Sequence, residues 1–477
     1  MATRTPTRPP RADQQADDAQ APRGLAARVS LGRVFAPVPS EFLLISSTAL
    51  LLTGFGLVMV LSATTASATA EGQSPFEALI KQGVFAMIGI PLMFVASRFP
   101  LRFWKRIAWP LLGVAVLFQL LVFVPGLGIE ILGNRNWISI AGQTVQPSEF
   151  LKLSLALWVA YVLYRKQTLL GLWRHVFIPL VPVSAAVIAT VMAGHDLGTA
   201  MILVLIVLGG LFFSGVRLRI FLLPLIAAAA YVAYMAVASP NRMRRIMSFM
   251  NDDCDYFNDC YQAMHGVFGL AGGGIFGLGL GNSKEKYGWL PARANDYIFA
   301  IVGEEVGLIG CIVILGLFTL FAVGAFHVIR KTHDPFIRIA AGGITVWIVG
   351  QALINIGVVL RIFPVLGVPL PFMSQGGTAL LSVLMACGVL LSFARTLPTS
   401  SAVPRSVARG GSTEARRGKV TSWRPTLRPA AAPLTCWRCG GFTSPRRRRS
   451  CSTRPRRRRA PAWRSSCPAR RSGSPCS

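Results

Sequence analysis

Ten long apolar runs dominate this sequence and limit what it can fold into. An α-helix needs about 20 mainly apolar residues to cross the hydrocarbon core of a bilayer, and each run is close to that length. Only 14% of the residues are charged and 53% are hydrophobic, whereas water-soluble domains are usually about a quarter charged. The sequence therefore predicts an all-α polytopic membrane protein with ten transmembrane helices, at residues 43–63, 79–97, 107–125, 148–164, 176–194, 198–215, 219–238, 297–328, 338–360 and 372–394.

Basic residues predict which loops face the cytoplasm. They concentrate in every second turn between the predicted spans, where the positive-inside rule expects cytoplasmic loops. Both termini are then cytoplasmic, and residues 64–78, 126–147, 239–296 and 361–371 lie outside, with the largest outer loop between spans 7 and 8. The basic residues are Arg98, Arg102, Lys105, Arg106, Arg165, Lys166, Arg174, Arg217, Arg219, Arg330, Lys331 and Arg338.

Three regions of different composition follow one another along the chain. Residues 1–40 are rich in Pro, Ala, Arg and Gln and lack an apolar run, so we expect a disordered cytoplasmic segment without a cleavable signal peptide. Residues 41–396 hold the transmembrane domain. Residues 397–477 are rich in Arg, Pro and Cys and cannot bury a core, so they are predicted to be disordered. A GC-rich gene read out of frame, as after a frameshift, gives the same composition, and we assign this tail no function.

The large positive charge does not indicate a nucleic-acid partner. The formal net charge is +30, but from residue 401 onward there are 20 Lys and Arg residues and one acid, Glu414. The tail therefore carries +19 and the rest of the chain +11. Basic cytoplasmic loops of a membrane protein explain that remainder, so we predict no nucleic-acid binding.

Three arginines, Arg242, Arg244 and Arg245, fall on the predicted outer side, where the positive-inside rule disfavours a cluster. One interpretation is a mispredicted span, or a helix end whose arginines extend to lipid phosphates. The other is a binding site for an anionic headgroup, because the guanidinium fork fits phosphate oxygens. Charge placement alone leaves both open.

Two pairs of residues have spacings that predict structural contacts. Glu149 and Lys152 lie three positions apart at the start of the fourth span, close enough to pair. We predict a structural ion pair rather than a catalytic one, because pairing is how a bilayer tolerates either charge. Cys254 and Cys260 share the largest outer loop, and an oxidising compartment favours a local disulfide over two free thiols.

Asp296 stands where the eighth predicted span begins, after a Gly-rich loop that contains Lys284, Lys286 and Arg293. A carboxylate at that boundary reaches water and can act on a molecule delivered by the bilayer. From the residues alone, a helix N-cap is the favoured interpretation, because Asn-Asp before an apolar run is a common start signal.

Short stretches spread over nearly all the spans make residues 42–395 resemble the SEDS family of cell-wall polymerases. The loop before Asp296 is more similar to the division-specific branch of that family than to the elongation-specific branch. The chain departs from the usual family pattern at Ala294 and Asn295, where relatives have His-Thr. The matching stretches are Val58–Ser62, Gly133–Trp137, Gln146–Glu149, Asp196–Thr199, Arg242–Arg245 with Ser248 and Phe249, Tyr261–Gln262, Gly279–Glu305, Asn355–Gly357, Pro369–Phe372 and Ser374 to Gly377.

The resemblance implies a peptidoglycan glycosyltransferase that joins lipid II units, with undecaprenyl diphosphate as the leaving group. It reverses the N-cap interpretation and assigns Asp296 as the base that takes the proton from the acceptor 4-hydroxyl. Arg242, Arg244, Arg245 and Lys286 are then candidates to hold the diphosphate, with Gln262 and Ser374 as further substrate-binding residues. The resemblance admits a divalent cation, Mg²⁺ or Mn²⁺, and predicts no organic cofactor.

The resemblance also implies partners and a location. The expected partners are lipid II, a class B penicillin-binding protein that cross-links the new strand, and other divisome proteins. The expected location is the cytoplasmic (inner) membrane of a bacterium, at the division septum. The alternatives are a lipid II flippase, a non-catalytic divisome scaffold and an elongation polymerase. A flippase needs polar residues along a path through several spans, and the sequence has few of them.

Overall fold

The computed structural model describes residues 39–131, 134–140, 142–237, 256–257 and 260–397, together with residues 243, 247 and 249. Residues 1–38 and 398–477, nearly all of the predicted disordered segments, therefore lie outside the described residues, and so do Arg242, Arg244, Arg245 and Cys254.

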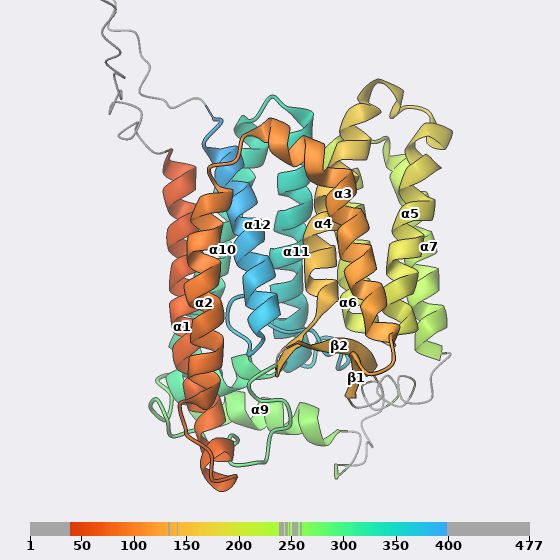
Figure 1. Ribbon diagram of the computed structural model, residues 1–477. Helices are drawn as coiled ribbons and strands as arrows, with labels where there is room; N and C mark the ends of the chain where they lie inside the picture. The colour runs from red at the N-terminus through yellow and green to blue at the C-terminus, as the bar shows by residue number, and fades with distance from the viewer. Residues whose placement is uncertain are drawn as a thin grey trace, which may run out of the picture. The chain divides into compact units, whose positions relative to one another are not determined.

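Each of the ten predicted spans coincides with a helix. Figure 1 shows these helices running side by side in one bundle, with loops at its two ends. The helices are α1 (Ser40–Ala70), α2 (Glu77–Ala96), α3 (Leu101–Leu120), α4 (Pro147–Arg165), α5 (Trp173–Ala193), α6 (Leu197–Ser214), α7 (Leu218–Val237), α10 (Ile298–Lys331), α11 (Pro335–Val359) and α12 (Gly377–Ala394).

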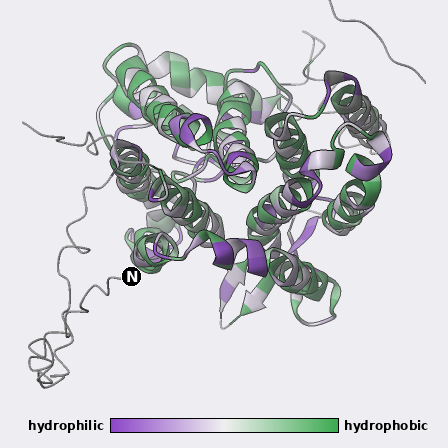
Figure 2. Ribbon diagram, turned by 90° about the horizontal axis from the view of Figure 1, so that it is seen from above, coloured by the Kyte–Doolittle hydropathy of each residue, from purple (hydrophilic) through white to green (hydrophobic). Residues whose placement is uncertain are grey.

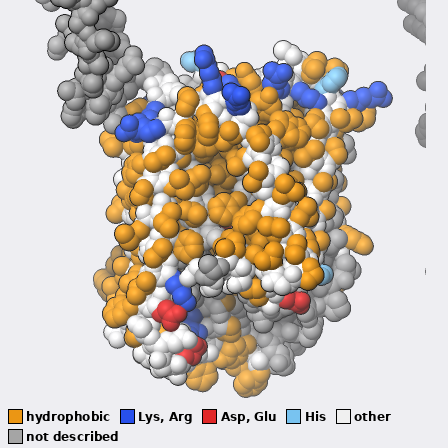
Figure 3. All heavy atoms as spheres, viewed as in Figure 1, with side chains coloured by type: hydrophobic (Ala, Val, Ile, Leu, Met, Phe, Trp, Pro, Cys, Tyr) orange, Lys and Arg blue, Asp and Glu red, His pale blue; other side chains and the backbone are white. Residues whose placement is uncertain are grey.

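Eight of these helices, all except α4 and α7, are long and apolar enough to cross a membrane by length and composition within the described residues. The predicted fold class, an all-α polytopic membrane protein, is confirmed. Figure 3 shows most of the visible Lys and Arg at one end of the bundle, a broad hydrophobic band beyond them, and a smaller group of basic and acidic side chains at the other end. The total of ten spans and the cytoplasmic location of the basic end stay predictions.

Short elements cover the end of the bundle opposite the basic residues. They include a small antiparallel sheet, in the order β1–β2–β3, which the sequence did not predict. The backbone N–H of Arg135 in β2 donates to the carbonyl of Gly194 at 3.0 Å, so the sheet is fixed to the turn between α5 and α6. The elements are η2 (Leu121–Phe123), β1 (Gly128–Ile131), β2 (Asn134–Ile140), β3 (Gln143–Val145) and α9 (Tyr261–Gly273), and η3 (Gln167–Leu169) follows α4.

The helices differ in how much of their surface the protein buries. α11 and α12 are mostly buried, whereas α2 and α3 leave most of their apolar surface exposed. Figure 2, which looks down the helices, shows hydrophobic residues all around them, as expected where the surroundings are lipid. Small residues allow close helix contacts: a Cβ at Gly388 of α12 would lie 2.6 Å from the carbonyl of Met93 in α2.

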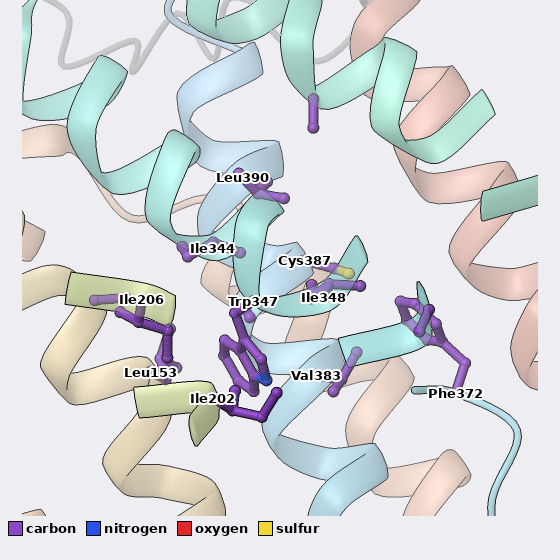
Figure 4. Close-up of a cluster of buried hydrophobic side chains, with 14 of the residues drawn as sticks. Leu153, Ile202, Ile206, Ile344, Trp347, Ile348, Phe372, Val383, Cys387 and Leu390 are labelled. Carbon is purple, nitrogen blue, oxygen red and sulfur yellow. The ribbon is translucent and has the colours of Figure 1, made fainter. Parts of the chain in front are cut away.

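The centre of the bundle is packed around Trp347 of α11, which is fully buried. Its neighbours come from three other helices: Leu153 from α4, Ile202 and Ile206 from α6, and Val383 from α12 (Figure 4). Because lipid tails are as apolar as these side chains, close van der Waals packing holds the helices together here rather than the exclusion of water. This rigid centre supports the loops at the end opposite the basic residues.

Candidate active site

Asp296 lies two positions before the first residue of α10 and is partly exposed. The N-cap of α10 is Tyr297, and its side chain makes no capping hydrogen bond. The helix N-cap interpretation of Asp296 is therefore wrong by one residue. The carboxylate lies beside the loop between α11 and α12, where a Cβ at Gly367 would be 3.8 Å from its Oδ2 atom.

Three consecutive backbone carbonyls fix the position of Asp296. The carbonyl of Ala294 accepts from the N–H of Gln375 at 2.8 Å, and that of Asn295 accepts from Ser374 Oγ at 2.5 Å. The carbonyl of Asp296 itself accepts from Asn355 Nδ2 at 2.7 Å. Donors from α11 and from the loop before α12 thus hold the backbone of a residue that stands outside any helix. Such support is what a catalytic carboxylate needs, because its position must be set before the reaction.

The helix that follows Asp296 is broken at Gly307, whose φ is 75° and ψ is −170°. The break leaves the carbonyls of Glu304 and Glu305 without helical partners, and the N–H groups of Leu278 and Gly279 donate to them at 2.9 and 3.0 Å. In the other direction, the N–H of Leu308 donates to the carbonyl of Gly274 at 3.0 Å. Irregular backbone at membrane depth is tolerated only where such groups are satisfied by protein.

The two glutamates before the break bind the loop that leads to Asp296. Glu304 is buried and accepts hydrogen bonds from the Ser283 hydroxyl and from the N–H groups of Lys284, at 2.7 Å, and Glu285, at 3.3 Å. Glu305 accepts hydrogen bonds from Ser62 Oγ of α1 at 2.7 Å. Together they tie residues 283–285 to both α10 and α1.

Lys286 completes this group. Its Nζ lies 3.2 Å from Glu305 Oε1 and also donates to the carbonyl of Gly281, and the side chain is only 3% exposed. Lys286 was a candidate to hold the diphosphate. The structure instead pairs its charge inside the protein, where it holds the loop and does not face solvent.

The predicted ion pair between Glu149 and Lys152 is present, with Nζ and Oε1 separated by 2.8 Å and both side chains almost fully buried. Lys152 also donates to Gln351 of α11 at 3.2 Å, and Ser382 of α12 donates to Glu149 at 3.1 Å. Gln351 in turn donates to the carbonyl of Pro369 at 2.8 Å. The pair therefore joins three helices to the loop that supports Asp296.

The remaining predicted residues have mixed outcomes. Gln262 donates to the carbonyl of Pro291 at 3.2 Å, and Ser374 supports the backbone at Asn295, so both contact the Asp296 loop.

The predicted disulfide is described at one of its two cysteines. Cys260 is buried and disulfide-bonded. Its predicted partner, Cys254, is outside the described residues, so the pairing itself stays a prediction.

Sequence reasoning missed a buried histidine and acid pair beneath the loop. His265 Nδ1 of α9 lies 2.7 Å from Glu285 Oε2, and the ring stacks on Trp289 with the centroids 5.9 Å apart. Burial raises the pKa of Glu285 above its ordinary value of 4.5, and the contact with His265 partly opposes this rise. The two residues are 20 positions apart, and α9 ends at Gly273 before the irregular loop that carries Glu285, so helical spacing could not have shown the pair.

The described residues show strained backbone only in loops at this end of the bundle. Their non-glycine residues with positive φ are His195, Ala292, Arg361 and Phe372. Positive φ is uncommon for residues other than Gly, Asn, Asp and His, and strained residues gather at functional sites. Within the described part of the chain, no group of three or more His, Cys, Asp or Glu residues could hold a metal ion.

Residues 42–398 match the family model described as a cell cycle protein, which covers FtsW, RodA and SpoVE. The chain belongs to this family. The resemblance to the SEDS family that the motifs indicated is thus confirmed. The match begins two residues inside α1 and includes all the described helices from α2 to α12.

Curated relatives in the FtsW/RodA/SpoVE family are similar over most of the chain. A protein of Mycobacterium tuberculosis named probable peptidoglycan glycosyltransferase FtsW is 36% identical over 390 residues, which cover 82% of this chain and 74% of that protein. One of Geobacter metallireducens with the same name is 37% identical, covering 73% of this chain and 93% of that protein. Stage V sporulation protein E of Bacillus subtilis is 36% identical, covering 74% and 97%.

Solved structures share the fold. One, of a peptidoglycan synthase complex, has a TM-score of 0.61 at 24% identity and covers 74% of this chain and 96% of the matched chain. The rod shape determining protein RodA of Thermus thermophilus has a TM-score of 0.56 at 23% identity, covering 76% and 98%. At these identities the structures support the helical fold of the family.

Proposed function

We propose that this protein is a peptidoglycan glycosyltransferase that polymerises lipid II on the outer face of the cytoplasmic membrane during cell division. The observation that carries the proposal is the support of Asp296 by three consecutive carbonyl contacts. The names of two relatives of this chain, both probable peptidoglycan glycosyltransferase FtsW, also support the proposal.

Asp296 acts in this proposal as the general base. Its carboxylate takes the proton of the acceptor 4-hydroxyl while the oxygen attacks the anomeric carbon of the donor, and the bond from that carbon to the diphosphate breaks. Diphosphate is a good leaving group and needs no acid behind it. One carboxylate therefore suffices, in contrast to the carboxylate pair of glycoside hydrolysis.

Fixed cations stabilise the charge that develops on the diphosphate. Arg242, Arg244 and Arg245 keep this proposed role, and Gln262 and Ser374 act mainly by shaping the loop that carries Asp296.

A divalent cation, Mg²⁺ or Mn²⁺, fits the site only if it is shared with the substrate. Mg²⁺ is commonly bound by one or two carboxylates together with substrate phosphates, and Asp296 with a diphosphate offers that set. Loss of activity in a chelator and its return with either metal would test this part.

The likeness to a peptidoglycan synthase complex supports a class B penicillin-binding protein as the partner. The names of the relatives support a role among divisome proteins at the septum of the inner membrane. The partner would cross-link the strand that this protein makes.

The test is polymerisation of labelled lipid II by the purified protein, alone and together with its penicillin-binding partner. We expect Asp296→Asn to lower the rate by about 10²–10⁴-fold, the usual contribution of a general base. Glu130→Gln is the control, because Glu130 is an exposed acid on β1. Equal rates for wild type and Asp296→Asn would remove Asp296 from catalysis. If wild type made no polymer in either setting, the enzyme assignment would be wrong, and lipid II translocation in vesicles would be measured next.

A further inference from the structure

Arg361 occupies a backbone position that favours glycine. It comes after Leu360, the C-cap of α11, and has a φ of 56°. The N–H of Ile362 donates to the carbonyl of Gly357 at 2.7 Å, and the N–H of Arg361 donates to that of Val358 at 3.0 Å. These two bonds are those of the Schellman motif, whose left-handed residue is usually Gly and sometimes Asn. The protein therefore places a bulky charged side chain where it costs conformational energy.

The guanidinium of Arg361 has no anionic partner within the described part of the chain. The ion pairs there do not include it. Among the described residues its side chain makes one hydrogen bond, from Nη1 to Met264 Sδ of α9 at 3.2 Å, and a thioether is a weak, uncharged acceptor. The side chain is only partly exposed. A half-buried guanidinium paired this weakly keeps most of its capacity to bind an anion.

Apolar side chains surround this cation on its own loop. Leu360, Ile362 and Phe363 are 48%, 59% and 44% exposed. A cation flanked by exposed apolar side chains matches an amphiphile with an anionic head and a hydrocarbon chain. A free phosphate or a soluble sugar nucleotide would use only the cation.

The loop that begins at Arg361 also lines Asp296. Asn355, which donates to the carbonyl of Asp296 at 2.7 Å, precedes Arg361 by six positions, or about 9 Å along a helix. Gly367, near the other end of the same loop, lies beside the Asp296 carboxylate. The segment from Asn355 to Gly367 therefore carries the cation and also contacts the residue that bears the base.

We propose that Arg361 binds the diphosphate of a prenyl-linked sugar substrate, with Leu360, Ile362 and Phe363 against the first isoprene units. This rests on the proposed function and names a substrate-binding residue for it. The guanidinium fork offers paired donors to phosphate oxygens. The backbone strain at Arg361 is retained because a glycine there would stabilise the helix end and lose the anion contact.

The strained backbone makes a clean experiment possible, because the informative variants should fold at least as well as wild type. Arg361→Gly and Arg361→Asn remove the charge and suit the left-handed position, so we expect an equal or higher melting temperature in detergent. We expect KM for lipid II to rise about tenfold to a hundredfold, the scale of one lost charge-assisted hydrogen bond, with kcat changed less. Arg361→Lys keeps the charge without the fork and should fall between them and wild type.

A binding measurement separates this proposal from the enzyme assignment. Undecaprenyl diphosphate in nanodiscs is the probe, with undecaprenol and inorganic pyrophosphate as comparisons. We expect wild type to bind the diphosphate lipid most tightly, and Arg361→Gly to lose that preference even if no polymer forms. An unchanged KM and unchanged binding in a well-folded Arg361→Gly would overturn the proposal. Equal weakening by Arg361→Lys and Arg361→Gly would show that shape and not charge matters, which also contradicts it.

Discussion

Two clusters of buried charged residues support the loops around Asp296 in different ways. The helix cluster, formed by Glu149, Lys152, Gln351 and Ser382, has one acid and one base. The loop cluster, formed by Ser62, Ser283, Lys286, Glu304 and Glu305, has two acids and one base. In the loop cluster, backbone N–H groups and hydroxyls supply the stabilisation that a second cation would give.

This difference bears on what each cluster does. A balanced pair within one helix needs only its neighbours to satisfy it, and replacement by apolar residues can be nearly neutral. An acid bound by backbone N–H groups fixes the path of that backbone. The loop cluster therefore determines where residues 283–296 run, whereas the helix cluster mainly holds helices together.

The largest effect should come from the single cation of the loop cluster. Lys286→Met leaves the buried Glu305 without its charge partner, beside a second buried carboxylate, so we expect about 3–5 kcal/mol less stability and almost complete loss of polymerisation. Lys284→Met is the matched control, because Lys284 is exposed, and it should change stability by less than about 0.5 kcal/mol. Unfolding in detergent and lipid II polymerisation measure both. If Lys286→Met and Lys284→Met gave similar stability and similar activity, the claim that the loop cluster holds the loop before Asp296 would be wrong.

Paired substitutions should separate the clusters next. Lys152→Met alone should cost about 3 kcal/mol, and adding Glu149→Gln should restore much of that loss, because no unpaired charge then remains. Combining Lys286→Met with Glu305→Gln should restore stability but not activity, because Glu305 also accepts from Ser62 and Ser283. A double-mutant cycle for each pair gives the coupling energies. Recovered polymerisation in the second double variant would show that the loop cluster does not position Asp296.

A smaller effect is expected from the two serines that donate to the clusters. Ser62→Ala and Ser382→Ala each remove a hydrogen bond to a carboxylate, worth about 1.5–3 kcal/mol. Both should lower the melting temperature. Only Ser62→Ala should also lower kcat, because it loosens the loop before Asp296. Equal kcat values in the two variants would remove this distinction.

The smallest effect concerns pH and the Glu285 pair beneath the loop. Because burial raises the pKa of Glu285 above 4.5, the folded state binds this proton more tightly than the unfolded state, and the bound proton contributes to folding stability. That contribution is full below pH 4.5 and is lost as pH rises through the raised pKa. The melting temperature of wild type relative to Glu285→Gln should therefore fall as the pH rises from about 4.5 towards neutrality. If the difference in melting temperature between wild type and Glu285→Gln did not vary with pH, the raised pKa of Glu285 would be contradicted.

The sequence alone determined the class of fold and the positions of the ten helices. Apolar length is a local property, and a helix in a bilayer satisfies its own backbone, so each span could be located without knowing its neighbours. The Glu149–Lys152 pair was predictable for the same reason, because three positions on one helix bring the side chains together. Family motifs supplied Asp296, which the residues alone would have made a helix cap.

Only the tertiary structure decided how the loop around Asp296 is held. Ser62 and Glu305 are 243 positions apart, and Ser374 and Asn295 are 79 apart, so nothing in local spacing joins them. The sequence predicts Lys286 as a diphosphate ligand, and only the structure shows its contact with Glu305, 19 positions further along the chain. The break at Gly307 and the left-handed Arg361 are backbone features that residue types do not specify. They depend on which groups the folded chain brings within hydrogen-bonding distance, and sequence spacing does not encode that distance in irregular loops.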